Sequence, residues 1–157
     1  MTNPRATTTT VAEEPWDSAD GVLLRDAMQA ELAARYGMPD QETDKPTAET
    51  VSVFLVARDQ QGGAIGCGAL RLQDDGTAEI KRMYVDPEAR GTGAATGILR
   101  ALEDHARQRG ADSVVLSTGT EQPDAIRFYE REGYQLFDGF GPFAGHPMAR
   151  FFTRRLG

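Results

Sequence analysis

The stretch that decides the fold is Tyr84-Val85-Asp86-Pro87-Glu88-Ala89-Arg90-Gly91-Thr92-Gly93-Ala94-Ala95-Thr96-Gly97. The apolar segment before it, residues 77–85, predicts a strand, and the apolar stripe after it predicts a helix over residues 94–109. Glycines at such a junction permit a tight turn and leave backbone N–H groups unobstructed at the positive end of the helix dipole. The stretch is therefore a candidate phosphate-binding turn.

The turn fits two common phosphate-binding motifs poorly. A mononucleotide P-loop needs Lys followed by Ser or Thr after its last glycine, and this turn contains no lysine. A dinucleotide fingerprint needs glycine where Thr96 stands and an acidic residue at the end of the next strand, whereas Asp112 precedes that strand. Taken alone, the turn leaves open a phosphate site and a glycine-rich connection that binds nothing.

The remaining elements are predicted from apolar periodicity and from turn residues. Asp17 or Ser18 can cap a helix that ends at Gly37, and the polar residues 38–50 predict a loop. Strands are expected at residues 51–59, 64–73, 77–85, 113–117, 134–137 and 149–155, with a further helix over 123–132. Residues 7–11 fit an edge strand or a polar tail. The predicted elements come in the order of a run of strands followed by alternating helices and strands. This order predicts a three-layer α/β domain with a mixed sheet.

Length and composition limit the classes of function. The 157 residues suit one domain, expected over 7–157, after a disordered tail at 1–6. A net charge of −7 argues against a nucleic-acid partner. Cys67 is the only cysteine and there are two histidines, so no metal site is expected. No apolar run is long enough to span a membrane and no hydrophobic signal core begins the chain, which predicts a cytoplasmic protein without a membrane partner.

Three segments in order resemble the GNAT superfamily of acyl-CoA-dependent N-acyltransferases. Residues 90–95 match its Gln/Arg-x-x-Gly-x-Gly/Ala pattern, residues 78–85 look like its fourth strand, and residues 125–134 resemble its tyrosine-bearing helix and strand. The resemblance is specific from about Thr77 to Phe137. It implies a GNAT-like fold, with a mostly antiparallel sheet and helices on both faces, and an N-acetyltransferase that uses acetyl-CoA.

The resemblance implies a set of cofactor contacts. The pyrophosphate of the coenzyme would lie on the amides of Arg90, Gly91, Thr92, Gly93, Ala94 and Ala95. The pantetheine arm would run beside the backbone of Met83, Tyr84 and Val85, and an N–H there would face the thioester oxygen. Gln122 stands where family members often carry an asparagine that helps to hold the cofactor, so that one contact is in doubt.

Direct attack of an amine on the thioester needs an acid and a base. Tyr129 is the candidate acid, because a tyrosine pKa of about 10 lies above that of a thiol, about 8.5, so the phenol can protonate the leaving sulfur. Its alternative is an aromatic residue packed between helix and sheet. Glu79 is the candidate base, and its alternative is an ion pair with Lys81 or Arg71.

The acceptor is predicted to be a primary amine of a small molecule. In the family the first helix, the loop after it and the last hairpin wall the acceptor side; here they contain the aromatic residues Trp16, Tyr36, Phe140 and Phe143, with Asp40, Glu42 and Asp44. An acidic mouth would favour a cationic amine, although a solvated acidic face explains the same residues. The alternatives are a peptide or protein acetyltransferase and a non-catalytic acyl-CoA sensor. A dinucleotide-binding module is the third alternative. A monomer and a homodimer are both compatible with the sequence.

Overall fold

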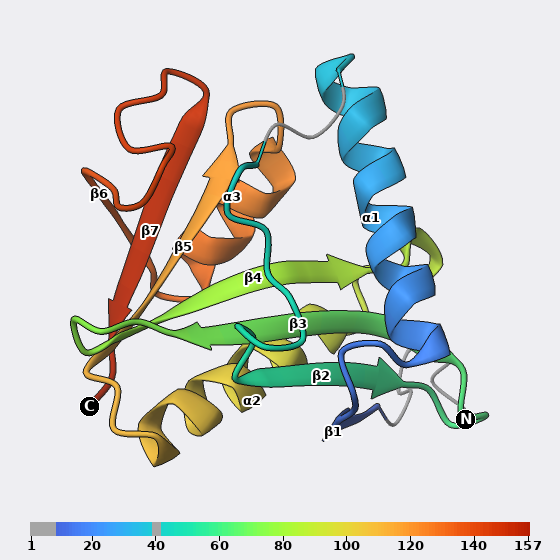
Figure 1. Ribbon diagram of the computed structural model, residues 1–157. Coiled ribbons are helices and arrows are strands. Elements are labelled where there is room, and N and C mark those ends of the chain that lie inside the picture. Colours follow the sequence, from blue (N-terminus) through green and yellow to red (C-terminus); the bar gives the residue numbers. More distant parts are fainter. Residues whose placement is uncertain (1–8, 39–41) are drawn as a thin grey trace.

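The computed structural model describes residues 9–38 and 42–157, and these form a twisted seven-stranded sheet. Its strand order is β1-β2-β3-β4-β5-β7-β6, and only β4 and β5 pair in parallel. The strands are β1 (Thr10–Glu13), β2 (Val53–Arg58), β3 (Ala64–Leu72), β4 (Thr77–Val85), β5 (Ser113–Gly119), β6 (Gln135–Phe137) and β7 (Ala149–Arg155). Figure 1 shows β5, β7 and β6 turned steeply away from β1–β4.

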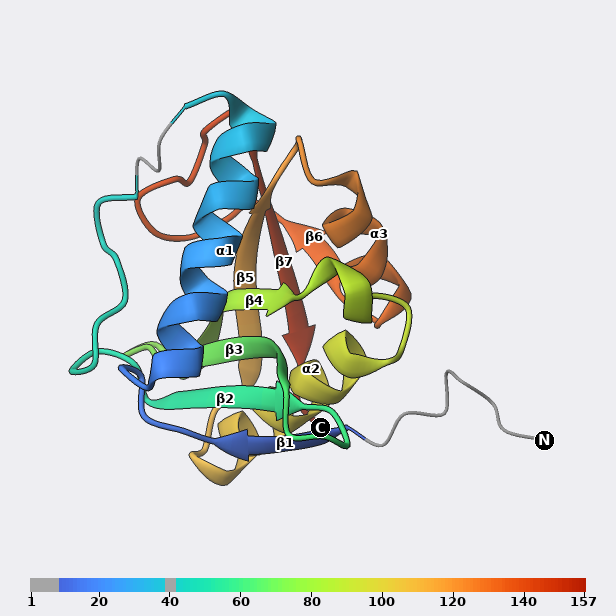
Figure 2. The same cartoon turned by 90° about the vertical axis from the view of Figure 1, so that its right-hand side faces the viewer.

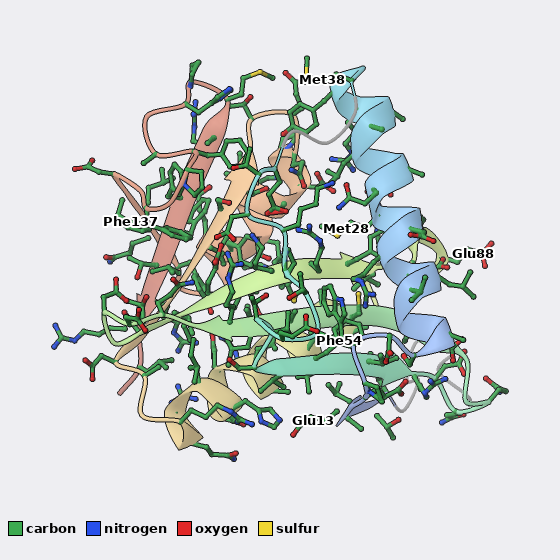
Figure 3. The ribbon with its side chains drawn as sticks, in the orientation of Figure 1. Glu13, Met28, Met38, Phe54, Glu88 and Phe137 are labelled. Carbon is green, nitrogen blue, oxygen red and sulfur yellow. The ribbon has the colours of Figure 1, made fainter. Side chains whose placement is uncertain are left out.

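Helices cover both faces of this sheet, as expected. Helix α1 (Ala19–Tyr36) lies on one face, and α2 (Ala94–Gln108) and α3 (Pro123–Arg131) lie on the other (Figure 2). Alternate residues of β2 serve the two layers: Val53 and Leu55 pack toward α2, whereas Phe54 and Val56 pack toward α1. Met28 and Phe54, labelled in Figure 3, belong to the α1 side. Across the described residues, none of the helices has the length and apolar character needed to cross a membrane.

The predicted elements are present, with small shifts at their ends. Of the edge strand considered at residues 7–11, the described part begins at Thr10, and the strand continues to Glu13. Its register aligns Val11 with Ala57 on β2, and an ion pair joins Glu14 to Arg58 at 2.9 Å. The strand expected at 51–59 is shorter, since Asp59 instead closes the turn that follows by accepting the Gly63 N–H at 2.8 Å. The expected tail at 1–6 lies outside the described residues.

Helix α1 begins and ends with the predicted caps. The Ser18 hydroxyl accepts the Gly21 N–H at 3.1 Å, and Gly37 ends the helix in the left-handed conformation at φ 68°. Between these caps, the apolar side chains of α1 begin over the sheet with Leu24 and continue toward the carboxyl end of β5.

The parallel pair β4–β5 separates early. Only Thr77–Glu79 of β4 pair with Ser113–Val115 of β5, and the two strands diverge beyond that point (Figure 1). A bulge lies in the diverging part, where Arg82 and Met83 together oppose Gly68 on β3 and Arg82 takes a φ of 56°. Gly68 is required there, because a Cβ would lie 2.8 Å from Ile98 and 2.9 Å from Leu102 on α2. The bulge and the split together open the sheet in the middle.

A buried ionic cluster ties α2 to the second half of the sheet. Glu103 on α2 is 1% exposed and receives hydrogen bonds from Arg100, from Arg154 on β7, and from the Tyr134 hydroxyl at 2.7 Å. Burial, together with the Glu103 carboxylate, raises the pKa of Tyr134, so this phenol stays a donor.

This cluster predicts a large effect of removing its anion. Glu103→Ala should lower the free energy of unfolding by about 3 kcal/mol, because a buried hydroxyl and two arginines lose their shared partner. Asp104→Ala is the matched control, since Asp104 is exposed and, among the described residues, forms an ion pair with Arg107 alone; its loss should stay below about 0.5 kcal/mol. Urea unfolding of both variants measures the difference, and equal losses would contradict the prediction.

Candidate active site

Two connected cavities occupy the opening between β4 and β5. The turn cavity, about 400 Å³, lies beside the glycine turn, and the central cavity, about 320 Å³, lies between the diverging strands. They share a boundary contributed by α1, β4 and α3, formed by Met28, Leu32, Met83, Gln122, Ala125 and Tyr129. A long, thin ligand can therefore reach the middle of the sheet from the glycine turn.

The glycine turn presents backbone donors to the turn cavity. Gly91 and Gly93 have φ of 82° and 90°, and no atom lies within 4 Å of where a Cβ would stand on either. The first intrahelical bond of α2 runs from the Gly97 N–H to the Gly93 carbonyl at 3.0 Å, so the amides of Ala94, Ala95 and Thr96 precede it. Gly91, Gly93, Ala95 and Thr96 line the cavity, which makes this helix terminus suitable for a phosphate.

Three further residues predicted to contact the cofactor, Arg90, Thr92 and Ala94, also stabilise the turn itself. Ala94 is buried in the core, and the Thr92 hydroxyl donates to the Ala89 carbonyl at 2.6 Å. Arg90 donates through Nε to the Val85 carbonyl at 3.0 Å and through Nη2 to Glu31 on α1 at 2.7 Å. Arg90 therefore fastens the turn to the end of β4 and to α1, while still lining the cavity.

The β4 backbone predicted beside the pantetheine lies at the split. Met83 lines both cavities, and Tyr84 and Val85 line the turn cavity. Because β5 accompanies β4 only to Glu79, no strand covers the edge of residues 80–85 on the β5 side within the described chain. That edge is open to a ligand in the cleft.

Tyr129 packs between helix and sheet and also lines the cleft. It is 7% exposed, and its ring packs edge-on against Tyr134 at 5.6 Å and near Phe152 at 6.0 Å. It also lines both cavities at their junction. Burial raises the pKa of Tyr129, which keeps the phenol protonated at neutral pH.

Glu79 lies at the other side of the central cavity and forms both of the ion pairs considered for it. Its carboxylate lies 2.9 Å from Arg71 Nη2 and 3.3 Å from Lys81 Nζ, and it accepts a hydrogen bond from Gln73 at 3.0 Å. It is 5% exposed and lines the central cavity together with Tyr129. The structure thus brings the candidate base and the candidate acid to one cavity.

Gln122 joins α1 to α3 across the cleft. Its side-chain amide lies 3.4 Å from the Tyr36 hydroxyl, and it lines both cavities. One turn away, Arg35 forms an ion pair with Asp124 at 2.9 Å. Sequence reasoning missed this bridge, because no local pattern links residues 89 positions apart. It did find the stripe of Met28, Leu32 and Tyr36, which turns out to face the cavities.

Some of the residues predicted on the acceptor side line the central cavity, and others do not. Tyr36 and Phe143 line the central cavity, and Phe140 lies nearby. Trp16 was wrongly placed there. It lies just before α1, where its ring meets Phe54 edge-on at 5.2 Å and is covered by the Arg25 guanidinium at 3.6 Å, because these partners partly bury it over β2. Asp40 lies outside the described residues.

The carboxylates of the predicted acidic mouth are paired with cations. Glu42 contacts both Lys81 and Arg82 at 2.6 Å, and Asp44 lies 3.3 Å from Arg71. Burial disfavours the charged form of Glu42, but hydrogen bonds from Arg82 and Lys81 outweigh it and lower the pKa of this carboxyl. The cavity therefore carries less net negative charge than the loop composition suggests.

The described residues hold no cluster of three or more His, Cys, Asp or Glu side chains arranged for a metal ion. Cys67 is fully buried, and burial raises the pKa of its thiol to about 12. Its sulfur donates to the Arg82 carbonyl at 3.3 Å. Cys67 therefore supports the bulge and is unsuited to act as a nucleophile.

Comparisons with known proteins agree with this geometry. The chain is 38% identical over 104 residues to the IAA acetyltransferase of Azospirillum brasilense, a match that covers 66% of this chain and 67% of that protein. Two further curated N-acetyltransferases, from Schizosaccharomyces pombe and Xenopus tropicalis, are matched over 63% and 49% of their own length.

Solved structures match nearly the whole chain. One from Klebsiella pneumoniae, described as an acyl-CoA N-acyltransferase, superimposes with a TM-score of 0.83 at 33% identity, over 96% of this chain and 99% of that one. The PaiA N-acetyltransferase of Thermoplasma acidophilum in complex with coenzyme A gives a TM-score of 0.71 at 16% identity over 94% and 99%, a likeness of fold alone. The model of the Acetyltransferase (GNAT) family matches residues 16–134, and the chain belongs to this family.

Proposed function

We propose that this protein transfers an acetyl group from acetyl-CoA to the primary amine of a small molecule. The observation that carries the proposal is the split between β4 and β5, which opens on a phosphate-binding turn at one end and on Tyr129 and Glu79 at the other. A protein of the same fold was solved with coenzyme A, which supports this donor. Cavities of about 320 and 400 Å³ are of the size that small ligands occupy.

The residues present suit coenzyme A along the length of the cleft. Its pyrophosphate would lie on the amides at the start of α2, where Gly91 and Gly93 leave room for the phosphate oxygens. The pantetheine would follow the open edge of Met83–Val85, with Gln122 facing it. This places the thioester at the junction of the two cavities, beside Tyr129.

The proposed reaction is direct attack in a ternary complex. The amine nitrogen forms a bond to the thioester carbonyl carbon, the carbon–sulfur bond breaks, and the thiolate takes the Tyr129 proton. The nitrogen then releases its surplus proton to solvent, from which the Tyr129 phenolate regains a proton. Glu79 accepts the proton that the acceptor ammonium must lose before attack. A backbone N–H of Tyr84 or Val85 would stabilise the oxyanion. The Glu79 carboxylate lies against Arg71 and Lys81 in the structure, so both cations flank the proposed base.

The glycine turn predicts where the donor binds. Saturating acetyl-CoA should raise the melting temperature by several degrees, because a ligand at 100 times its Kd adds about 2.7 kcal/mol, whereas NAD and ATP should not. Gly93→Ala should weaken acetyl-CoA at least about tenfold by distorting the amides. Gly62→Ala is the control: Gly62 also has a positive φ, 83°, but lies in the β2–β3 turn. A shift with NAD alone would contradict the donor.

Removing the acid should slow chemistry more than binding. Tyr129→Phe should lower kcat about 100-fold with little change in the KM for acetyl-CoA, because one positioned proton donor is lost. Tyr134→Phe removes another buried hydroxyl and should cost stability without a comparable loss of kcat. Thiol release from acetyl-CoA measures both.

The raised pKa of Tyr129 fixes the sign of the pH dependence. An acid must be protonated to act, and burial keeps this phenol protonated above its usual pKa of about 10. The wild-type kcat should therefore not fall on the alkaline side up to about pH 9.5. A fall in kcat centred near pH 8 would argue against Tyr129 as the proton donor, as would a Tyr129→Phe variant with full kcat. Binding of acetyl-CoA without turnover by the wild type would instead fit a non-catalytic acyl-CoA sensor.

Glu79→Gln separates a base from a structural ion pair. As a base, Glu79 is needed in its charged form, so the variant should lose about 100-fold in kcat at neutral pH and recover part of it at high pH, where the amine is already deprotonated. If Glu79 only holds Arg71 and Lys81, the variant should lose thermal stability and keep the wild-type pH profile. The pH profile of kcat is the measurement that decides.

A further inference from the structure

A third cavity adjoins the proposed site, on the side away from the glycine turn. This aromatic cavity, about 350 Å³, is bounded by the segment Phe137–Phe143, by β7, and by the polar residues of β3 and β4. It shares Glu42, Glu79, Lys81, Ser117 and Phe143 with the central cavity. A molecule whose amine lies beside Glu79 can therefore extend into it.

One wall of this cavity is aromatic. Phe137 and Phe140 stack at 6.2 Å with their planes 4° apart, and both meet the ring of Phe151 edge-on, at 6.3 and 5.6 Å. Phe137 is labelled in Figure 3, on the β6 side of the molecule. Gly139 makes the arrangement possible, because at its φ of 119° a Cβ would lie 2.7 Å from the Phe151 ring.

These rings are not simply core. Phe151 is buried, but Phe137, Phe140 and Phe143 remain partly exposed and face the cavity. Their spacing of three residues, with glycines between them, holds three rings on one short segment. A concave aromatic surface beside a reaction centre is typical of a ligand site.

The facing polar wall carries charges that satisfy one another. Arg71 pairs with Glu79 and Asp44, at 2.9 and 3.3 Å. Lys81 pairs with Glu79 and Glu42, at 3.3 and 2.6 Å. A second charged group on the acceptor would have to displace one of these pairs. A flat apolar group lies against the rings without disturbing them.

We infer that the aromatic cavity binds a planar, aromatic group of the acceptor, so that the substrate is an arylalkylamine. This inference rests on the proposed function, since it assumes that the amine reacts beside Glu79. The ring of the substrate stacks in the space faced by Phe140 and Phe143, and a short linker carries the amine into the central cavity. Specificity then comes from the segment Phe137–Phe143.

The test compares three amines on the full chain: 2-phenylethylamine, n-butylamine and butane-1,4-diamine. Thiol release from acetyl-CoA gives kcat/KM for each, and saturation-transfer NMR reports ring binding without turnover. We expect 2-phenylethylamine to exceed n-butylamine at least about tenfold in kcat/KM. Phe140→Ala should reduce that ratio to below about three, and Phe140→Leu, which keeps most of the volume, should reduce it partly.

Leu136→Ala is the control, because Leu136 is 57% exposed next to Phe137 on β6 and does not line the cavity; its ratio should equal that of the wild type. Equal kcat/KM for all amines, a preference for the diamine, or a ratio unchanged in both Phe140 variants overturns the subsite while leaving the acetyltransferase intact. Absence of turnover, with ring binding that Phe140→Ala abolishes, supports the subsite and overturns the proposed function. Neither turnover nor ring binding overturns both.

Discussion

Strand β4 runs for nine residues, but its parallel partner β5 stays beside it for only three of them. Backbone groups beyond Glu79 therefore lie at an open edge, where a pair of continuous strands would have joined them. The bulge at Arg82 turns this edge, and Gly68 lets α2 approach closely enough to fix the bulge. Strand β4 contributes residues to the turn, central and aromatic cavities. The short length over which β4 pairs with β5 therefore determines where all three cavities lie.

Ion pairs then define the chemistry beside that edge. Glu79 is buried, and the cations Arg71 and Lys81 both contact its carboxylate. The same cations hold residues 42–44 against β3 and β4 through Glu42 and Asp44. One network of ion pairs therefore surrounds the candidate base and closes the acceptor side. This coupling explains why acidic composition alone gave a misleading estimate of the charge offered to a substrate.

Most of the fold could be predicted from the sequence because its signals are local. The caps of α1, the turn glycines and the period-two apolar strands lie within a few residues of the structures they specify. The candidate acid, base and turn were found through motif resemblance, and the structure brings them to one cleft. Trp16 and the Arg35–Asp124 bridge could not be predicted in this way. The edge-on contact of Trp16 with Phe54 and the pairing across 89 positions depend on tertiary packing, which leaves no local pattern.

The position of Tyr129 depends on contacts far from any ligand. Helix α3 has only nine residues and contacts the sheet mainly through β5. A helix this short does not by itself hold the Tyr129 ring in place. The ring of Tyr134 packs against Tyr129, and the Tyr134 hydroxyl donates to Glu103, which also contacts Arg100 and Arg154. The buried ionic cluster on α2 is thus linked to the proposed proton donor through a single residue, Tyr134. The ring of Tyr134, which packs on Tyr129 with or without its hydroxyl, would in this way hold the proposed proton donor at the edge of the cleft.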